Sequence, residues 1–387
     1  MTGPAFRNFL VWISGLILGC SMSVIRQVVI RVDASVEMGM GHLARCMSLA
    51  NELSRGGARI VFVMREHAAR LGGLVEANGH TPLFLRDPER HLNHSNATDR
   101  AHSHWLPTTW QGDAEQSSEV IGGIGHVDWL IVDHYALDAE WESVQRRYGV
   151  RILAIDDLAD RPHDCDILLD QNLVLNMEAR YRNRVSATCK QMLGPRYALL
   201  RPEFAEARKS TPDRSGDIHR ILVCFGGSDP SNETAKALAA IKGVDIDSLA
   251  IDVVVGSGNP HADLISRLSS ELPCAELHRG ADNMAALMSR ADLAIGAGGI
   301  MSWERCCLGL PTIAVDIAAN QIGTLTALAR AGAVVYLGSA SSVTPRQIAS
   351  AIQLALNDSE NIKAMGEAAR LLVDGEGCGR VRAAMEI

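Results

Sequence analysis

A glycine-rich turn that ends in a histidine is the most informative chemical feature of this chain. Gly39-Met-Gly41-His42 separates the apolar run Val28–Val32 from a stretch with helical spacing of apolar residues that begins at Leu43. The pattern predicts a strand, a glycine loop and a helix with an imidazole at its start. A helix start suits a phosphate and disfavours a protonated imidazole, because it carries free N–H groups and a partial positive charge. His42 is therefore a candidate proton acceptor, and the alternative is a tight turn with a capping histidine.

Two further groups in the first half follow predicted strands. Asp133-His134-Tyr135 ends one strand, and Asp156-Asp157 ends the next. A His and a Tyr at such a place can be packed only, but their position matches that of His42. Paired carboxylates can bind a metal, yet no clustered His or third carboxylate accompanies them in the sequence. We therefore predict that the site uses no metal.

Glycine-rich loops mark the second half. Gly226-Gly227-Ser228, Gly256-Ser257-Gly258 and Gly296–Gly299 each follow a predicted strand, and a helix is predicted to begin near Ser302. Glycine lets backbone amides approach an oxyanion, so three such loops favour a nucleotide diphosphate site that includes Gly227, Ser228, Gly298, Gly299 and Ser302. None has the spacing of a P-loop or of a dinucleotide-binding turn.

Three polar residues near these loops could contact a nucleotide. Glu304, one turn into the helix, could accept both hydroxyls of a ribose, or it could simply pair with the helix dipole. Asn320 and Gln321 follow the predicted strand Thr312–Val315, where their amides could face a cleft or cap a helix.

Strands and helices alternate along the chain, which predicts parallel sheets covered on both faces. The predicted strands are Val28–Val32, Arg59–Met64, Thr81–Leu85, Trp129–Asp133, Arg151–Ile155, Asp166–Leu169, Ile221–Phe225, Ile251–Val255, Asp292–Ile295 and Thr312–Val315. We expect an α/β protein of two doubly wound, Rossmann-like domains whose strand ends face each other across a cleft. The expected N-terminal domain, 25–205, carries the base, 206–217 form a linker, and 218–387 form a nucleotide-binding C-terminal domain.

Composition narrows the class of protein. The 387 residues are 47% hydrophobic and 21% charged, as in globular proteins, and the net charge of −8 argues against nucleic-acid binding. The nine cysteines form no Cys-x-x-Cys pair, which suits a reducing cytosol. We expect a cytoplasmic monomer.

The first residues resemble a leader. Phe9–Cys20 is apolar, follows Arg7 and ends in a possible cleavage box. Because Met22 stands directly before the first strand, we interpret residues 1–24 as a non-native or leader extension, and the alternative is a short membrane anchor.

Ordered motifs over residues 28–321 resemble those of the UDP-sugar hydrolases of pseudaminic acid biosynthesis, GT-B proteins similar to the peptidoglycan N-acetylglucosaminyl transferase. The motifs are Arg31-Val-Asp33, Gly39-Met-Gly-His42, Trp105-Leu106 with Asp113-Ala114, Val132-Asp-His-Tyr135, Leu168-Leu-Asp-Gln-Asn172, Leu193-Gly-Pro-Arg-Tyr-Ala-Leu-Leu-Arg-Pro-Glu-Phe204, Phe225-Gly-Gly-Ser-Asp-Pro230, Gly296-Ala-Gly-Gly299, Ser302-Trp-Glu-Arg-Cys-Cys-Leu-Gly-Leu-Pro311 and Asn320-Gln321.

The resemblance implies a GT-B-like fold in which the C-terminal domain, 218–387, binds UDP. It also implies hydrolysis of UDP-2,4-diacetamido-2,4,6-trideoxy-β-L-altropyranose to UDP and the free sugar. Water attacks the anomeric carbon with inversion, His42 is the base, and no cofactor or metal takes part. Tyr135 would orient the water or the sugar, while Asp33 and Ser35, with Gly39 and Gly41, would shape the loop or touch the sugar.

Two alternatives stay open: a GT-B glycosyltransferase that uses a UDP-sugar donor, and a catalytically silent sugar-nucleotide binding protein. The chain departs from the family in two places. Ile300-Met301 replaces small hydroxyl residues that would help to hold a phosphate, and residues 91–104 are longer and richer in histidine than expected.

Overall fold

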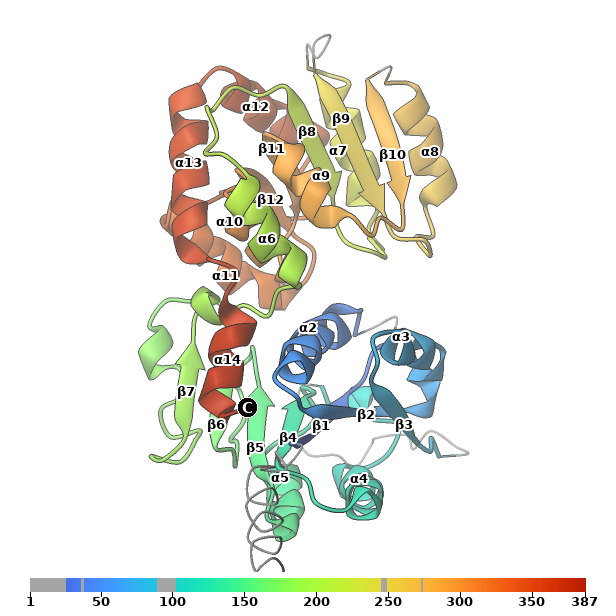
Figure 1. Ribbon diagram of the computed structural model, residues 1–387. Coiled ribbons are helices and arrows are strands. Elements are labelled where there is room, and N and C mark those ends of the chain that lie inside the picture. Colours follow the sequence, from blue (N-terminus) through green and yellow to red (C-terminus); the bar gives the residue numbers. More distant parts are fainter. Residues whose placement is uncertain (1–25, 36–37, 89–101, 245–248, 273) are drawn as a thin grey trace, which may run out of the picture.

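The computed structural model describes residues 26–35, 38–88, 102–244, 249–272 and 274–387. Within these ranges the chain forms two α/β domains, one above the other in Figure 1. The segment interpreted as a leader, residues 1–24, lies outside the described residues, as does most of the histidine-rich segment 91–104.

A parallel sheet of seven strands forms the centre of the N-terminal domain. In spatial order the strands are β3 (Thr81–Leu85), β2 (Arg59–Arg65), β1 (Gln27–Val32), β4 (Trp129–Asp133), β5 (Arg151–Ile155), β6 (Ile167–Asp170) and β7 (Lys190–Leu193). The order reverses between β1 and β4, where Val32 pairs with Asp133. Ligands of doubly wound proteins bind beside such a reversal, at the carboxyl ends of the strands.

Helices cover both faces of this sheet, and each face has its own apolar core. The α-helices are α2 (Gly41–Arg55), α3 (Gly72–Ala77), α4 (Trp110–Ile124) and α5 (Ala139–Gln145), and the 3-10 helices are η2 (Glu66–Leu71), η3 (Ser103–Trp105), η4 (Arg146–Tyr148), η5 (Met177–Ala179) and η6 (Pro195–Tyr197). Helix α2 forms because Leu43, Cys46, Leu49, Ala50 and Leu53 recur on one face, and all five are buried against the sheet.

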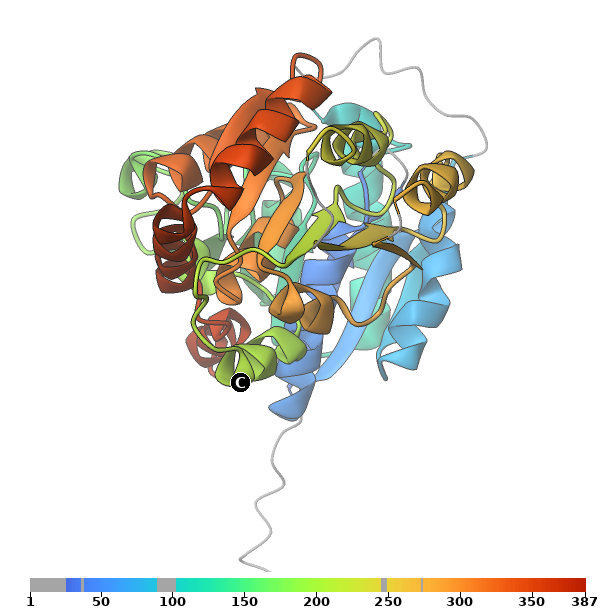
Figure 2. The ribbon, with the colours of Figure 1, turned by 90° about the horizontal axis from the view of Figure 1, so that it is seen from above.

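The C-terminal domain repeats this plan with six parallel strands. Their spatial order is β10 (Ala275–Arg279), β9 (Ala250–Val255), β8 (Arg220–Cys224), β11 (Leu293–Ala297), β12 (Thr312–Asp316) and β13 (Val335–Ser339). The helices are α7 (Glu233–Ile241), α8 (Ala262–Ser270), α9 (Met284–Arg290), α10 (Ile300–Cys307), α11 (Ala319–Arg330), α12 (Pro345–Leu356) and α13 (Ser359–Leu372). Figure 2 shows helices on both faces of the sheet, which matches two separate cores. The predicted α/β, GT-B-like fold is confirmed.

The chain crosses between the domains differently from the predicted boundaries. Helix α6 (Pro202–Ser210) includes the first residues of the predicted linker 206–217, and its Phe204 is buried in a core of the C-terminal domain. Helix α14 (Gly377–Met385) returns to the N-terminal domain, where Val381 and Met385 join the core beside α2 (Figure 1). A polar composition predicted a linker at 206–210, but the segment is a docked helix. Phe204 is buried in the core, and the guanidinium of Arg208 donates to the carbonyl oxygens of Cys307 at 2.6 Å and Arg370 at 3.0 Å.

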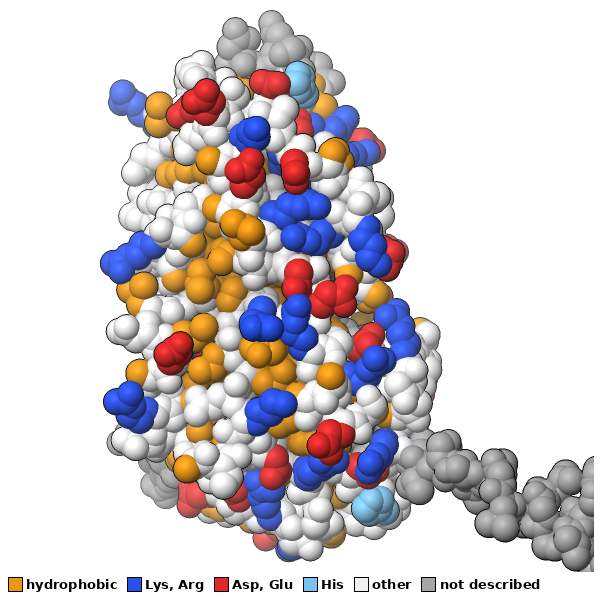
Figure 3. All heavy atoms as spheres, turned by 60° about the vertical axis from the view of Figure 1, so that its left-hand side comes forward, with side chains coloured by type: hydrophobic (Ala, Val, Ile, Leu, Met, Phe, Trp, Pro, Cys, Tyr) orange, Lys and Arg blue, Asp and Glu red, His pale blue; other side chains and the backbone are white. Residues whose placement is uncertain are grey.

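The surface mixes charges of both signs. On the face drawn in Figure 3, lysine and arginine side chains lie among acidic side chains and small apolar areas. Within the described part of the chain, no helix has the length and apolar character needed to cross a membrane.

Candidate active site

The two domains meet around a cavity of about 200 Å³. It is lined from the N-terminal domain by Met38, Gly41, His42, Arg45, Tyr135, Asp157, Gln171 and Asn172, and from the C-terminal domain by Gly299, Ile300, Trp303, Asn320, Gln321 and Thr324. Of the predicted site residues, six therefore converge on one space: Gly41, His42, Tyr135, Gly299, Asn320 and Gln321.

His42 is the second residue of α2 and is held by a carboxylate. Its Nδ1 lies 2.6 Å from Oδ1 of Asp133, which ends β4. Burial favours the neutral form of Asp133, but Arg45 and His42 outweigh this effect and hold the pKa of the carboxyl well below its usual range. An ionised Asp133 accepts the proton on Nδ1, so a neutral His42 carries its lone pair on Nε2. The tautomer is therefore the one that a general base requires.

Arg45 connects this pair to a second carboxylate. Its Nε and Nη2 donate to the two oxygens of Asp133 at 2.6 and 2.7 Å, and its Nη1 donates to Oδ2 of Asp157 at 2.5 Å. The guanidinium is one turn after His42 on α2, so the helix that presents the base also carries the cation that fixes its partner. Such bidentate, buried pairing restricts the imidazole to one orientation.

Tyr135 is fixed from the other side of the same network. Its hydroxyl donates to Oδ2 of Asp157 at 2.6 Å, and its ring packs edge-on against that of His42 with centroids 4.6 Å apart. Burial and Asp157 raise the pKa of Tyr135 well above its usual value, so it stays a phenol. Because its proton is committed to Asp157, the oxygen is left as an acceptor.

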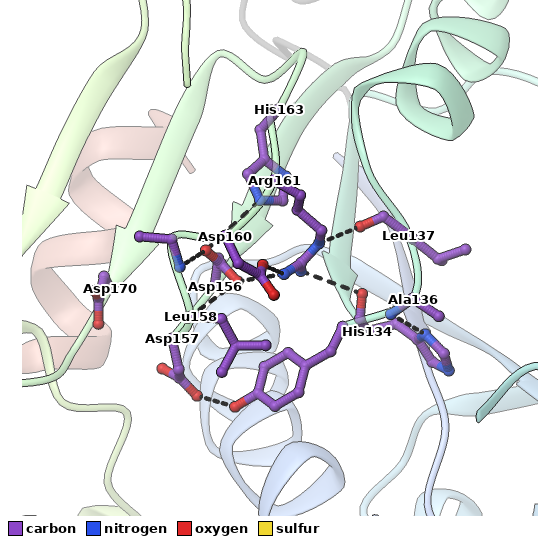
Figure 4. A network of polar contacts seen from close by, with 12 residues as sticks. His134, Ala136, Leu137, Asp156, Asp157, Leu158, Asp160, Arg161, His163 and Asp170 are labelled. Atoms are coloured by element: carbon purple, nitrogen blue, oxygen red, sulfur yellow. Dashed lines mark hydrogen bonds and ion pairs between the residues drawn. The ribbon is translucent and has the colours of Figure 1, made fainter. Parts of the chain in front are cut away.

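The network continues away from the cavity through buried charges. Arg161 donates to Asp156 at 2.8 Å, and His163 lies 3.7 Å from Asp156 (Figure 4). His163 also lies 2.8 Å from Glu142. Burial and the negative charge of Asp157 raise the pKa of Asp170 to about 7.

Asp33 is not placed to touch a sugar. Its side chain has no exposed area. The carboxylate accepts hydrogen bonds from the guanidinium of Arg31 at 2.8 Å and from the backbone N–H of Arg65 at 2.7 Å. Arg31 in turn pairs with Asp113 at 2.8 Å. His134 lies 3.5 Å from Asp33, and its burial is the main cause that lowers its pKa to about 3, so it is a neutral packed residue. The resemblance implied that Asp33 would shape the loop or touch the sugar, and the structure turns its carboxylate inward to the buried Arg31.

Ser35 and Gly39 shape the loop before α2. The Ser35 oxygen accepts from the N–H of Met38 at 3.1 Å, and its carbonyl accepts from the N–H of Gly39 at 2.9 Å. Gly39 has φ of 73°, which explains the need for glycine there. Neither residue lines the cavity.

The opposite wall is built from backbone. Helix α10 begins at Ile300 directly after Gly299, and Gly299 and Ile300 line the cavity. Gly298 lies against Gln321 so closely that a Cβ there would stand 2.9 Å from Cβ of Gln321. Helix α11 presents Asn320 and Gln321 to the same space. The start of α10 thus offers free N–H groups to an anion at the cavity.

Other residues predicted for the nucleotide are not among those that line this cavity. Gly227 and Ser228 are exposed on the loop after β8. Ser302 is buried, and its hydroxyl accepts from Arg305 at 3.3 Å. Glu304 is buried 3.7 Å from Arg201, and burial raises the pKa of its carboxyl.

Several lining residues were not among the predicted site residues: Met38, Arg45, Asp157, Gln171, Asn172, Ile300, Trp303 and Thr324. Asp157 and Gln171-Asn172 follow β5 and β6 directly, so the rule that identified Tyr135 after β4 also applied to them. At the family departure, Ile300 faces the cavity, while Met301 packs near Cys224, with the two sulfurs 3.7 Å apart.

Among the described residues, one group of side chains could reach a metal ion together: Asp252, Glu276 and His278. Asp252 already pairs with Arg220 at 3.1 Å and Arg290 at 2.6 Å. A cation there would have to compete with two guanidinium groups, so this group does not suit a metal centre.

Comparisons with known proteins agree with this geometry. Residues 221–375 match the glycosyltransferase family 28 C-terminal domain. MurG of Acinetobacter baumannii has the same fold, with a TM-score of 0.65 and 15% identity over 93% of this chain and 99% of MurG.

Three curated relatives share parts of the sequence. An uncharacterized protein of Methanocaldococcus jannaschii is 27% identical over 74% of this chain and 55% of its own length. The spore coat polysaccharide biosynthesis protein SpsG of Bacillus subtilis is 32% identical over 54% of this chain and 62% of its own length. The UDP-2,4-diacetamido-2,4,6-trideoxy-β-L-altropyranose hydrolase of Campylobacter jejuni is 29% identical over 52% of this chain and 71% of its own length. This chain thus has the GT-B fold, matches the glycosyltransferase family 28 C-terminal domain over residues 221–375, and is similar in sequence to that hydrolase over about half of its length.

Proposed function

We propose that the protein hydrolyses UDP-2,4-diacetamido-2,4,6-trideoxy-β-L-altropyranose to UDP and 2,4-diacetamido-2,4,6-trideoxy-L-altrose, a step of pseudaminic acid biosynthesis, in the cytoplasm. The observation that carries the proposal is the His42–Asp133 pair, at 2.6 Å, facing the start of α10 across the cavity. This arrangement combines an oriented base with a site for a leaving diphosphate. The resemblance to the Campylobacter jejuni hydrolase supplies the identity of the sugar.

In this mechanism the attacking water gives a proton to Nε2 of His42 as its oxygen bonds to the anomeric carbon. The carbon–oxygen bond to the diphosphate breaks, and its electron pair leaves with UDP. Asp133 stabilises the imidazolium that forms, and Arg45 keeps Asp133 ionised. Attack opposite the leaving group inverts the anomeric centre.

Tyr135 would complete the water site. Its oxygen can accept the second proton of the water because its own proton is donated to Asp157. One lone pair of the water then faces the sugar, which converts a mobile nucleophile into a positioned one.

UDP departs toward the C-terminal wall. Free N–H groups at the start of α10, the glycine loop before it, and the amides of Asn320 and Gln321 would hold the diphosphate, with Gly227 and Ser228 on the neighbouring loop. We assign the ribose hydroxyls to Glu304. A leaving group stabilised in this way does not need a strong general acid.

Incubation with this UDP-sugar, followed by NMR, tests the proposal. We expect UDP and free sugar to form together without any added acceptor. In ¹⁸O-water the label should enter the anomeric oxygen of the sugar and leave UDP unlabelled. Label in UDP would contradict carbon–oxygen cleavage.

A glycosyltransferase is the second candidate, favoured by the family 28 match and by the MurG-like fold. That function predicts UDP release only when an acceptor alcohol is present. The same incubation, with no acceptor, separates the two candidates.

A further inference from the structure

A cluster of aromatic rings surrounds His42 on the N-terminal side of the cavity. Trp105 lies at the end of η3, and the next residue, Leu106, is buried in the core under α4 and so anchors it. The Trp105 ring stacks on Tyr135 with centroids 5.2 Å apart and an angle of 22°. His42 stands edge-on to Trp105, at 5.8 Å and 84°. Neither the hydrolysis mechanism nor the predicted site used Trp105.

His102 extends this cluster. Its ring lies 4.7 Å from Trp105 and 5.3 Å from Tyr135, measured between centroids. Burial lowers the pKa of His102, so it presents an uncharged ring at neutral pH. We call the rings of His102 and Trp105 the aromatic wall. Both side chains are large and partly buried. Neither can move aside without losing its contacts with the neighbouring rings.

A base beside such a wall discriminates between nucleophiles by size. Water and an alcohol both bring an O–H to Nε2 of His42, but the alcohol also brings carbon atoms next to the reacting oxygen. The Nδ1 edge of His42 is occupied by Asp133 and by Nη2 of Arg45, at 3.2 Å. The Nε2 edge is left for the nucleophile, and the carbon atoms of an alcohol bound there would have to fit beside the rings of Tyr135 and Trp105, which contact the imidazole edge-on.

We propose that Trp105, supported by His102, excludes acceptor alcohols from His42 and so makes water the acceptor. This inference rests on the proposed function and deepens it. The chain shares its fold with glycosyltransferases, and the aromatic wall would make water, rather than an alcohol, the group that attacks the anomeric carbon. Trp105 acts as a specificity-determining residue, whereas His42 remains the base.

The test measures how the sugar is partitioned between water and methanol. Wild type and Trp105→Leu are incubated with the UDP-diacetamido sugar in buffer containing methanol, and NMR gives the ratio of methyl glycoside to free sugar. We expect this ratio to rise about tenfold or more in Trp105→Leu, since steric rejection of a single carbon is worth at least that much. Trp105→Phe, which keeps a ring, should stay near the wild-type ratio.

Two further variants serve as controls for this experiment. Trp110→Ala removes a tryptophan that packs on the neighbouring core and should leave the ratio unchanged. His102→Ala opens the same wall if Trp105→Leu is unstable, and it should raise the ratio by a smaller factor. Folded Trp105→Leu and His102→Ala proteins with the wild-type ratio would overturn the inference while hydrolysis stands. Wild type that releases no UDP without an acceptor would instead overturn the proposed function, and the inference with it.

Discussion

The two walls of the cavity are built by different means. On the N-terminal side, side-chain charges fix each other: Arg45 holds Asp133 and Asp157, and these hold His42 and Tyr135. On the C-terminal side, glycines and the start of α10 present backbone groups, and Gly298 lies directly against Gln321.

The difference follows from what each wall must do. A base has to be held in one tautomer and one orientation, which needs specific side-chain partners at fixed distances. A diphosphate needs several N–H donors close to it. Backbone amides can provide them where no Cβ stands between the chain and the ligand. We therefore expect the N-terminal wall to respond to changes of charge and the C-terminal wall to changes of shape.

The largest effect should come from replacing the base. His42→Asn should lower kcat by a factor of about 10²–10⁴, because it removes the proton acceptor. UDP affinity should change little, since the imidazole belongs to the wall that does not hold UDP. Steady-state kinetics and calorimetry with UDP measure the two quantities. A folded variant with wild-type turnover would show that His42 is not the base.

A charged wall should also make stability depend on pH. Burial by itself lowers the pKa of His163, but Glu142 and Asp156 outweigh it and raise the value to about 9 from 6.5. The folded state thus holds this proton more tightly than the unfolded state. Its contribution to the free energy of unfolding, on the order of 3 kcal/mol, is complete below about pH 6 and is lost as the pH rises through about 9.

Urea unfolding of wild type and His163→Gln at about pH 6 and about pH 10 measures this contribution. The difference between the two proteins should be large at the lower pH and small at the higher one. His126→Gln is the control, because the His126 side chain is 78% exposed. If the difference in free energy of unfolding between wild type and His163→Gln is the same at both pH values, His163 does not carry the charge.

The C-terminal wall can be tested by adding one methyl group. Gly298→Ala places a Cβ 2.9 Å from Cβ of Gln321 and should shift α11 against the glycine loop. We expect UDP to bind about tenfold more weakly, because the amide groups of the two elements no longer converge. Gly73→Ala is the control, since Gly73 lies on α3 outside the cavity and a Cβ there meets no atom within 4 Å. Equal UDP affinities for the two variants would contradict a wall built on close backbone packing.

The smallest effect is expected at the ribose. Glu304→Ala should weaken UDP binding by a factor of about five and leave kcat nearly unchanged, because a ribose contact is the same in the ground and transition states. Glu304→Gln should recover part of the affinity, since its amide oxygen still accepts hydrogen bonds. Calorimetry that finds unchanged UDP affinity in both variants would assign Glu304 a structural role only.

Sequence patterns predicted most of the fold and the centre of the site, for a reason that the structure makes plain. His42, Tyr135, Gly299 and Asn320 each follow a parallel strand, and strands of this type end at a common edge. Strand periodicity therefore predicts which loops meet. It does not predict which way a side chain turns: Asp33, which the resemblance implied would shape the loop or touch the sugar, turns inward to Arg31.

Such patterns could not predict contacts between residues that are far apart in the sequence. Asp133 orients His42 from 91 residues away, and nothing local in the sequence specifies that pair. Strand β10 was also missed, because its alternately half-buried and exposed residues lack the continuous apolar run of the central strands. The docked α6 was missed because Phe204 is its only buried residue.

The return of α14 to the N-terminal domain has a consequence for the order of synthesis. Met385 accepts a hydrogen bond from the indole of Trp129 at 3.1 Å, and Cys378 and Val381 fill the core beside α2. The ribosome makes these residues only after the whole C-terminal domain. The core beside α2, in the domain that emerges first, is therefore completed only after the domain that emerges second has been made.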